Sequence, residues 1–228
     1  MKLVIDFDDT IFDTNRFKRE RLFPCLKKYD ISAEVFEKNY EKYRQNNPIY
    51  DIYQHLEFFK KESNLDIDIE SVIYEISNGL ESFVFPEYLN IFKKYGRENI
   101  FILTQGDENF QQLKIKRSEV DKKVEEVLIV DSTKQEKIED ISLLWPNETI
   151  LFIDDKFKNL SFETENKNIR RIFVGEEANL SEEEHAYLIK HEIPILKRED
   201  LDKGILSEKE RLGIESNPEF HFNKERII

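Results

Sequence analysis

Short, continuous runs of apolar residues recur along the chain, and they predict its strands. The runs cover residues 2–7, 99–104, 126–131, 149–154 and 170–174. Each run has the length of a strand, and its apolar character is continuous rather than alternating. Strands that are apolar on both faces are typical of a parallel sheet covered by helices on both sides. The pattern therefore predicts an α/β fold with five parallel strands.

Polar and apolar residues alternate with a helical period between the last four runs. The helix-length segments cover residues 107–123, 133–145 and 157–166. Strands that are separated by single helices form a parallel sheet with right-handed crossovers. We therefore expect a doubly wound, Rossmann-like core.

The interval between the first two runs is much longer than one helix needs, and its pattern is helical throughout. Ser32 is a candidate N-cap within it, and Gly96 is a candidate C-terminal stop for the helix that precedes the second strand. We predict a helical cap domain here, over the carboxyl edge of the sheet. The predicted division is a core of residues 1–14 and 86–202, a cap of residues 15–85 and a charged C-terminal appendage of residues 203–228.

Charge and composition narrow the possible partners. The chain has 35 basic and 48 acidic residues and a net charge of −13, which disfavours binding to a nucleic-acid backbone. A single cysteine, Cys25, excludes an internal disulfide, and no apolar run approaches the roughly 18 residues of a membrane span. A carboxylate at Asp6 interrupts the segment where a signal peptide has its apolar core. We expect a soluble cytoplasmic protein, monomeric or dimeric, with no nucleic-acid or membrane partner.

Polar residues follow four of the five predicted strands, where ligands bind in open parallel sheets. The groups are residues 6–10, 104–107, 131–134 and 154–159. Residues two apart on a strand point the same way, so Asp6 and Asp8 can share one crevice. With Asp154 and Asp155 this crevice would hold up to four carboxylates, which repel one another unless a cation neutralises them. An all-oxygen site of this kind suits Mg²⁺ better than Zn²⁺.

Four motifs in this order resemble those of the haloacid dehalogenase superfamily, in its branch with a helical cap after the first strand. They are IDFDDT at residues 5–10, FILTQG at 101–106, TKQEKIEDI at 133–141 and LFIDDKFKN at 151–159. The resemblance covers about residues 1 to 175.

The resemblance implies a phosphatase-type active site. Asp6 would be the nucleophile that forms an aspartyl-phosphate, and Asp8 would be the general acid and then the general base. Thr104 and the backbone amide of Gln105 would hold the phosphate, and Lys134 would neutralise charge on Asp6 and the phosphoryl group. The resemblance further implies Mg²⁺ bound by Asp6, the backbone carbonyl of Asp8, and Asp155, with Asp154 as a nearby or direct ligand.

Several alternatives stay open at the level of sequence. Lys137 competes with Lys134 for the phosphate-binding role because it lies one helical turn further on, and Lys114 is a more remote third candidate. Asp9 and Asp13 are interpreted as loop or N-cap residues.

We predict a Mg²⁺-dependent phosphatase that acts on a small phosphorylated metabolite. The acid at Asp8 favours phosphoryl chemistry over dehalogenation. A phosphomutase would use the same residues, and a phosphate-binding or scaffold protein on the same fold is the non-enzymatic alternative.

Overall fold

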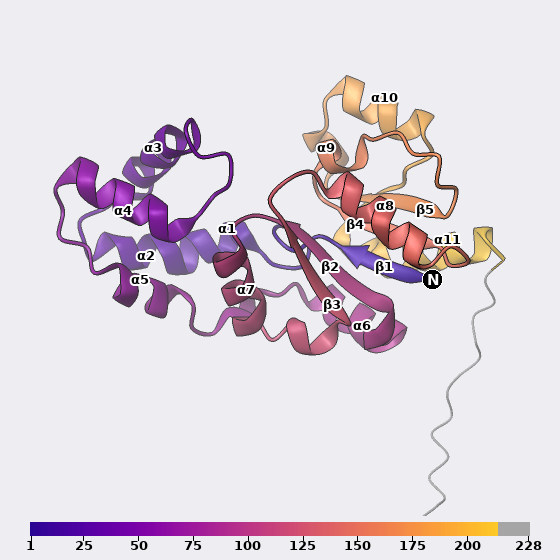
Figure 1. Cartoon of the computed structure of the whole chain (residues 1–228), viewed down its shortest axis with the longest axis horizontal. Helices are drawn as coiled ribbons and strands as arrows, with labels where there is room; N and C mark the ends of the chain where they lie inside the picture. The colour runs from indigo at the N-terminus through magenta and orange to yellow at the C-terminus, as the bar shows by residue number, and fades with distance from the viewer. Residues whose placement is uncertain (214–228) are drawn as a thin grey trace, which may run out of the picture.

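A six-stranded parallel sheet forms the centre of the molecule (Figure 1). The structure is a computed structural model, and it describes residues 1–213. The strand order is β3-β2-β1-β4-β5-β6. The strands are β1 (Lys2–Ile5), β2 (Ile100–Gln105), β3 (Glu126–Val130), β4 (Ile150–Asp154), β5 (Ile169–Val174) and β6 (Ile195–Leu196). The predicted α/β class is confirmed.

The sheet has one more strand than the sequence predicted. β6 pairs in parallel with β5, where Phe173 lies opposite Ile195 and Val174 opposite Leu196. A strand of two residues is too short to give a periodic signal, so the sequence does not predict it. The five predicted strands are all present.

Helices cover both faces of the sheet, as the continuous apolar runs predicted. On β1, Leu3 and Ile5 belong to one buried cluster, and Val4 between them belongs to the other. The first cluster receives apolar residues from α6 and α11, and the second receives them from α8 and α10. The helices that follow β1 and the insertion are α6 (Pro86–Tyr95), α7 (Glu108–Arg117), α8 (Lys134–Leu144), α9 (Phe157–Leu160), α10 (Glu182–Lys190) and α11 (Leu201–Arg211).

The segment between β1 and β2 begins with five helices, which gather at one end of the molecule away from most of the sheet (Figure 1). They are α1 (Thr14–Phe17), which continues through a π-helical turn (Lys18–Leu22) into α2 (Phe23–Lys27), then α3 (Ala33–Arg44), α4 (Ile52–Ser63) and α5 (Ile69–Ile76). Ser32 is the N-cap of α3, since its hydroxyl accepts a hydrogen bond from the Val35 amide at 3.2 Å. Gly96 ends α6 with a φ of 77°, as predicted.

Two extended segments connect these helices to the sheet, and they pair with each other. Phe12 and Val84 form an antiparallel bridge, and the Phe85 amide donates to the Ile11 carbonyl at 2.9 Å. The entry to and the exit from the helical insertion are therefore held side by side.

The prediction of a C-terminal appendage over residues 203–228 is wrong for the first part of this range. Residues 203–211 belong to α11, where Leu201 and Ile205 are buried and Asp202 forms an ion pair with Lys94 of α6 at 2.7 Å. Most of the charged residues of this segment lie on the exposed face of an amphipathic helix, although Glu208 is buried, and this high charge hid the packing of the helix. Residues 214–228 lie outside the described structure. Over residues 1–213, the helices all fall short of the length and apolarity that crossing a membrane requires.

Candidate active site

Lys134 is the central cation at the carboxyl edge of the sheet. It is the first residue of α8, and its side chain reaches back to the ends of β1 and β4. Its Nζ forms an ion pair with Asp6 Oδ1, and it lies 2.7 Å from Asp154 Oδ2. All three side chains are almost completely buried. Burial alone would lower the pKa of Lys134, but the two carboxylates outweigh it and raise that pKa.

A second contact network joins the acids of β1 and β4. Thr10 is fully buried, and its hydroxyl lies 3.3 Å from Asp6 Oδ2 and 3.2 Å from Asp155 Oδ1. The Lys156 amide donates to Asp154 Oδ1 at 2.8 Å, and Asn159 Nδ2 donates to the same oxygen at 3.0 Å. Asp154 is therefore held by its neighbours.

Asp6, Asp154 and Asp155 bring three carboxylates together, with oxygen atoms within 4.8 Å of one another. Burial and the nearby charge of Asp6 raise the pKa of Asp155 to about 7, and burial likewise raises the pKa of Asp154. A raised carboxyl pKa means that the nearby positive charge does not offset burial and repulsion in the ionised form. A hard cation that takes oxygen ligands would supply the missing positive charge, so this donor set fits Mg²⁺. Although Asp154 and Asp155 are adjacent in sequence, both join the cluster.

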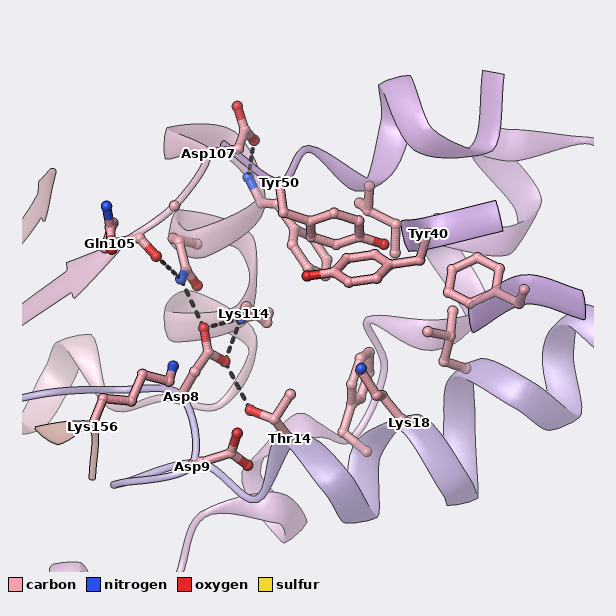
Figure 2. Close-up of a pocket in the computed structure, with 17 residues that line it drawn as sticks. Asp8, Asp9, Thr14, Lys18, Tyr40, Tyr50, Gln105, Asp107, Lys114 and Lys156 are labelled. Carbon is pink, nitrogen blue, oxygen red and sulfur yellow. Dashed lines mark hydrogen bonds and ion pairs between the residues drawn. The ribbon is translucent and has the colours of Figure 1, made fainter. Parts of the chain in front are cut away.

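Asp8 is held apart from these acids and faces α7 (Figure 2). Lys114 Nζ lies 2.7 Å from Asp8 Oδ2, Gln111 Nε2 donates to the same oxygen at 2.8 Å, and the Thr14 hydroxyl donates to Oδ1 at 3.0 Å. Burial raises the pKa of Asp8, but the Lys114 charge and these hydrogen bonds outweigh it, so that pKa is lowered. The Asp8 carboxylate is therefore stabilised in its ionised form.

The second predicted phosphate-binding element adjoins Asp8. Thr104 is buried near the end of β2, and Gln105 follows it. Gln111 Nε2 lies 3.1 Å from the Thr104 hydroxyl and 3.2 Å from the Gln105 carbonyl oxygen. One amide group thus connects the end of β2 to Asp8.

Sequence reasoning missed the roles of Lys114 and Gln111 and weighed Lys114 only as a phosphate-binding lysine. The two residues are three positions apart, so they share one face of α7. That spacing predicts that the two side chains lie near each other, but it does not show which carboxylate they contact. Lys137, the competitor of Lys134, is not part of the ion-pair network of Lys134, Asp6 and Asp154.

A cavity of about 250 Å³ opens between this edge and the helical insertion (Figure 2). Asp8, Gln105 and Lys114 line it on the side of the sheet, and Tyr40 and Tyr50 line it on the side of the insertion. Asp8 and Lys114 therefore border a cavity of ligand size, whereas Asp6, Lys134 and the acidic cluster at the sheet edge are not among the residues that line it.

Comparison with known proteins supports the fold. No protein-family model matches the sequence, and no curated protein matches it. A haloacid dehalogenase-like hydrolase from Burkholderia xenovorans has a similar structure, with a TM-score of 0.68 and 21% identity over 87% of this chain and 95% of that one.

Two further solved structures are similar. A β-phosphoglucomutase from Thermotoga maritima has a TM-score of 0.57 and 13% identity over 91% of this chain and 99% of that one. An L-2-haloacid dehalogenase from Xanthobacter autotrophicus has a TM-score of 0.56 and 15% identity over 90% of this chain and 98% of that one. The chain therefore has the fold of the haloacid dehalogenase superfamily.

Proposed function

We propose that the protein is a Mg²⁺-dependent phosphatase that hydrolyses a small phosphomonoester through an aspartyl-phosphate on Asp6. The observation that carries this proposal is the placement of Asp6, which is buried, paired with Lys134 and adjacent to two further carboxylates. A carboxylate that is held so firmly at a strand end is oriented for attack on a bound group.

In the first step, an Asp6 oxygen attacks phosphorus and the bond from phosphorus to the leaving oxygen breaks. Lys134 balances the charge of Asp6 and of the phosphoryl oxygens. Thr104 and the Gln105 amide hold the phosphoryl group at the end of β2. In the second step, water attacks the phosphorus of the aspartyl-phosphate and releases inorganic phosphate, which restores Asp6.

Asp8 is the proton donor to the leaving oxygen and then the acceptor of the proton from water. Its contacts with Lys114, Gln111 and Thr14 favour the ionised form. The ionised form suits the second step, in which Asp8 accepts a proton from water. Because Lys114 stabilises this form, it helps to set the pH range in which Asp8 carries the proton that the first step needs.

Mg²⁺ would be held by Asp6, Asp155 and the Asp8 carbonyl, with Asp154 beside it. When bound, it would neutralise the carboxylates and the phosphoryl oxygens. We also propose that residues 15–85 act as a cap over the site and that residues 1–14 and 86–202 are the catalytic domain. The cap then contributes one wall of the cavity that receives the substrate.

A phosphomutase is the second candidate, because one similar structure is that of a β-phosphoglucomutase. The two activities separate by product: a phosphatase releases inorganic phosphate, whereas a mutase returns a rearranged sugar phosphate. Incubation with glucose 1-phosphate and Mg²⁺, followed by analysis of both products, distinguishes them.

The covalent step has a direct test. The enzyme is incubated with Mg²⁺ and an aryl phosphate and quenched in acid, and the acyl phosphate is then reduced with borohydride. We expect mass spectrometry to find the reduction product at Asp6. Phosphate release with an unmodified Asp6 peptide under conditions that trap a control acyl phosphate would reject the intermediate.

A further inference from the structure

The wall of the cavity that belongs to the helical insertion is aromatic. Tyr40 of α3 and Tyr50, just before α4, lie edge to face with ring centroids 5.0 Å apart. Tyr50 also meets Phe110 of α7 edge to face at 6.5 Å, which links the insertion to the core of the molecule. Figure 2 shows both tyrosine rings across the cavity from Asp8 and Lys114.

Tyr40 and Tyr50 differ from the aromatic residues that form the interior of the insertion. Phe59 is 2% exposed, packs within the apolar cluster and does not line the cavity, whereas the two tyrosines line it and are only partly buried. Partial burial beside a cavity leaves ring surface available for a ligand.

Three of the polar groups around this end of the cavity already have partners. The Tyr50 hydroxyl lies 3.1 Å from His55 Nδ1, Lys18 Nζ lies 3.2 Å from Glu37 Oε1, and Asp107 Oδ1 accepts the Phe110 amide at 2.8 Å. A sugar brings several hydroxyl groups, and those that find no partner on burial cost free energy. A flat apolar ring meets no such cost and can stack on the tyrosines.

We propose that the substrate is the phosphomonoester of an alcohol that carries an aromatic ring, and that Tyr40 and Tyr50 bind this ring. The inference rests on the proposed phosphatase function and specifies its substrate class. The phosphate lies at the sheet edge near Asp6 and Lys134, and the ring occupies the aromatic end of the cavity.

Three substrates with primary alcohol leaving groups test this inference: benzyl phosphate, cyclohexylmethyl phosphate and glucose 6-phosphate. The first two differ in aromaticity at similar size, and the third is a polyol. We expect kcat/KM for benzyl phosphate to be about tenfold above that for cyclohexylmethyl phosphate, the size of an aromatic pair contribution. We expect kcat/KM for glucose 6-phosphate to be the lowest of the three. Equal or better turnover of glucose 6-phosphate would overturn the inference.

A pair of variants locates the preference in the cavity. Tyr40→Leu keeps an apolar side chain but removes the ring, so it should reduce the preference for benzyl over cyclohexylmethyl phosphate. Tyr74→Leu is the matched control, because Tyr74 is 67% exposed on α5 and does not line the cavity. An unchanged preference in folded Tyr40→Leu protein would also count against the inference.

Equilibrium binding separates this inference from the proposed function. Titration calorimetry with the Asp6→Asn protein and Mg²⁺ compares benzyl phosphate with glucose 6-phosphate without turnover. Tighter binding of benzyl phosphate, with no hydrolysis of any substrate by the unmodified protein, would reject the phosphatase function and retain the aromatic site. Hydrolysis of all three substrates with no preference in binding or turnover would retain the phosphatase and reject the aromatic site.

Discussion

Two buried polar clusters in this molecule are built on opposite principles. In the helical insertion, His55 is fully buried, and its two ring nitrogens each lie 3.1 Å from one partner, the Tyr50 hydroxyl and Asn39 Oδ1. A neutral imidazole satisfies both contacts, since one nitrogen accepts and the other donates. Burial, together with the charge of Lys18, lowers the pKa of His55 to about 4.

The cluster at the sheet edge has unbalanced charge. Asp6, Asp154 and Asp155 lie together, and within residues 1–213 only Lys134 forms ion pairs with them, through Asp6 and Asp154. Burial raises the pKa values of Asp154 and Asp155. A structural cluster has no need for such excess charge, because a neutral network is less costly. This difference supports our proposal that the charged cluster binds ligands, whereas the contacts of His55 hold parts of the insertion together.

The strongest test of this contrast removes one charge from the sheet edge. Asp6→Asn should lower phosphate release by about 10⁴-fold or more, because the variant has no nucleophile. Asp13→Asn is the control, since asparagine also serves as an N-cap and Asp13 caps α1 through its contact with the Arg16 amide. Initial rates with an aryl phosphate and Mg²⁺ measure both variants. Steady release by Asp6→Asn protein would reject the role of Asp6.

The second test removes the buried cation. Lys134→Met should lower the free energy of unfolding by about 3 kcal/mol or more in the absence of Mg²⁺, because it leaves Asp6 and Asp154 without their ion-pair partner. It should also reduce turnover, since phosphoryl charge loses its counter-charge.

Lys137→Met is the matched control, one helical turn along α8 and outside the ion-pair network, and we expect a change within about 0.5 kcal/mol. Urea unfolding of both variants measures the difference. Equal destabilisation by the two substitutions would contradict the central role of Lys134.

The contrast between the clusters also explains what sequence could predict. The strands and the acids at their ends follow from local features, namely the apolar runs and the carboxylates that come after them. The contact of Lys134 with Asp6 was implied by the family resemblance, and Lys137 remained an alternative until the structure placed Lys134 beside Asp6. The partner of Asp8 does not follow from local features, because Lys114 lies 106 residues away and meets Asp8 only through the packing of α7 against the loop after β1.

Two further features were beyond local reasoning. β6 is two residues long, and its position depends on pairing with β5 rather than on any pattern of its own. His55 has no ligand spacing with another histidine, and its neutrality depends on Tyr50 and Asn39, which are placed by different segments. The position of a polar residue in the chain is therefore more predictable than its partner.

The neutral cluster makes its own prediction about pH. The pKa of His55 is about 4 in the folded protein and near 6.5 when unfolded, so the unfolded chain takes up the proton first as the pH falls. This contribution to stability is fully present above pH 6.5 and is lost progressively as the pH falls toward 4. The total loss is about 3 kcal/mol. His55→Gln should be less stable at pH 8 but should lose less stability between pH 6.5 and 4.

Unfolding free energies of the unmodified and His55→Gln proteins across this pH range test the prediction. Both proteins contain the same carboxyl groups, so the difference between their free energies cancels the effect of carboxyl titration. His185→Gln serves as control, since His185 is 38% exposed and lies in α10, away from the insertion. Parallel pH curves for the unmodified and His55→Gln proteins would show that His55 is not the buried neutral group described here.

The charged cluster makes the converse prediction about Mg²⁺. At a hundredfold excess over its Kd, Mg²⁺ should stabilise the protein by about 2.7 kcal/mol, a rise in Tm of about 5–10 °C for a chain of this length. In the metal-free protein the pKa of Asp155 is about 7, above its usual 3.8, so stability from this group falls as the pH rises through that interval.

Asp155→Asn should therefore raise the metal-free Tm at pH 8 and lose most of the shift caused by Mg²⁺. Asp131→Asn, an exposed residue beyond the end of β3, should keep that shift in full. Thermal unfolding with Mg²⁺ or a chelator measures both variants. If Asp155→Asn lowered the metal-free Tm and retained the whole shift, Asp155 would not be a ligand of the cation, because its contact with the Thr10 hydroxyl would then outweigh the repulsion from Asp6.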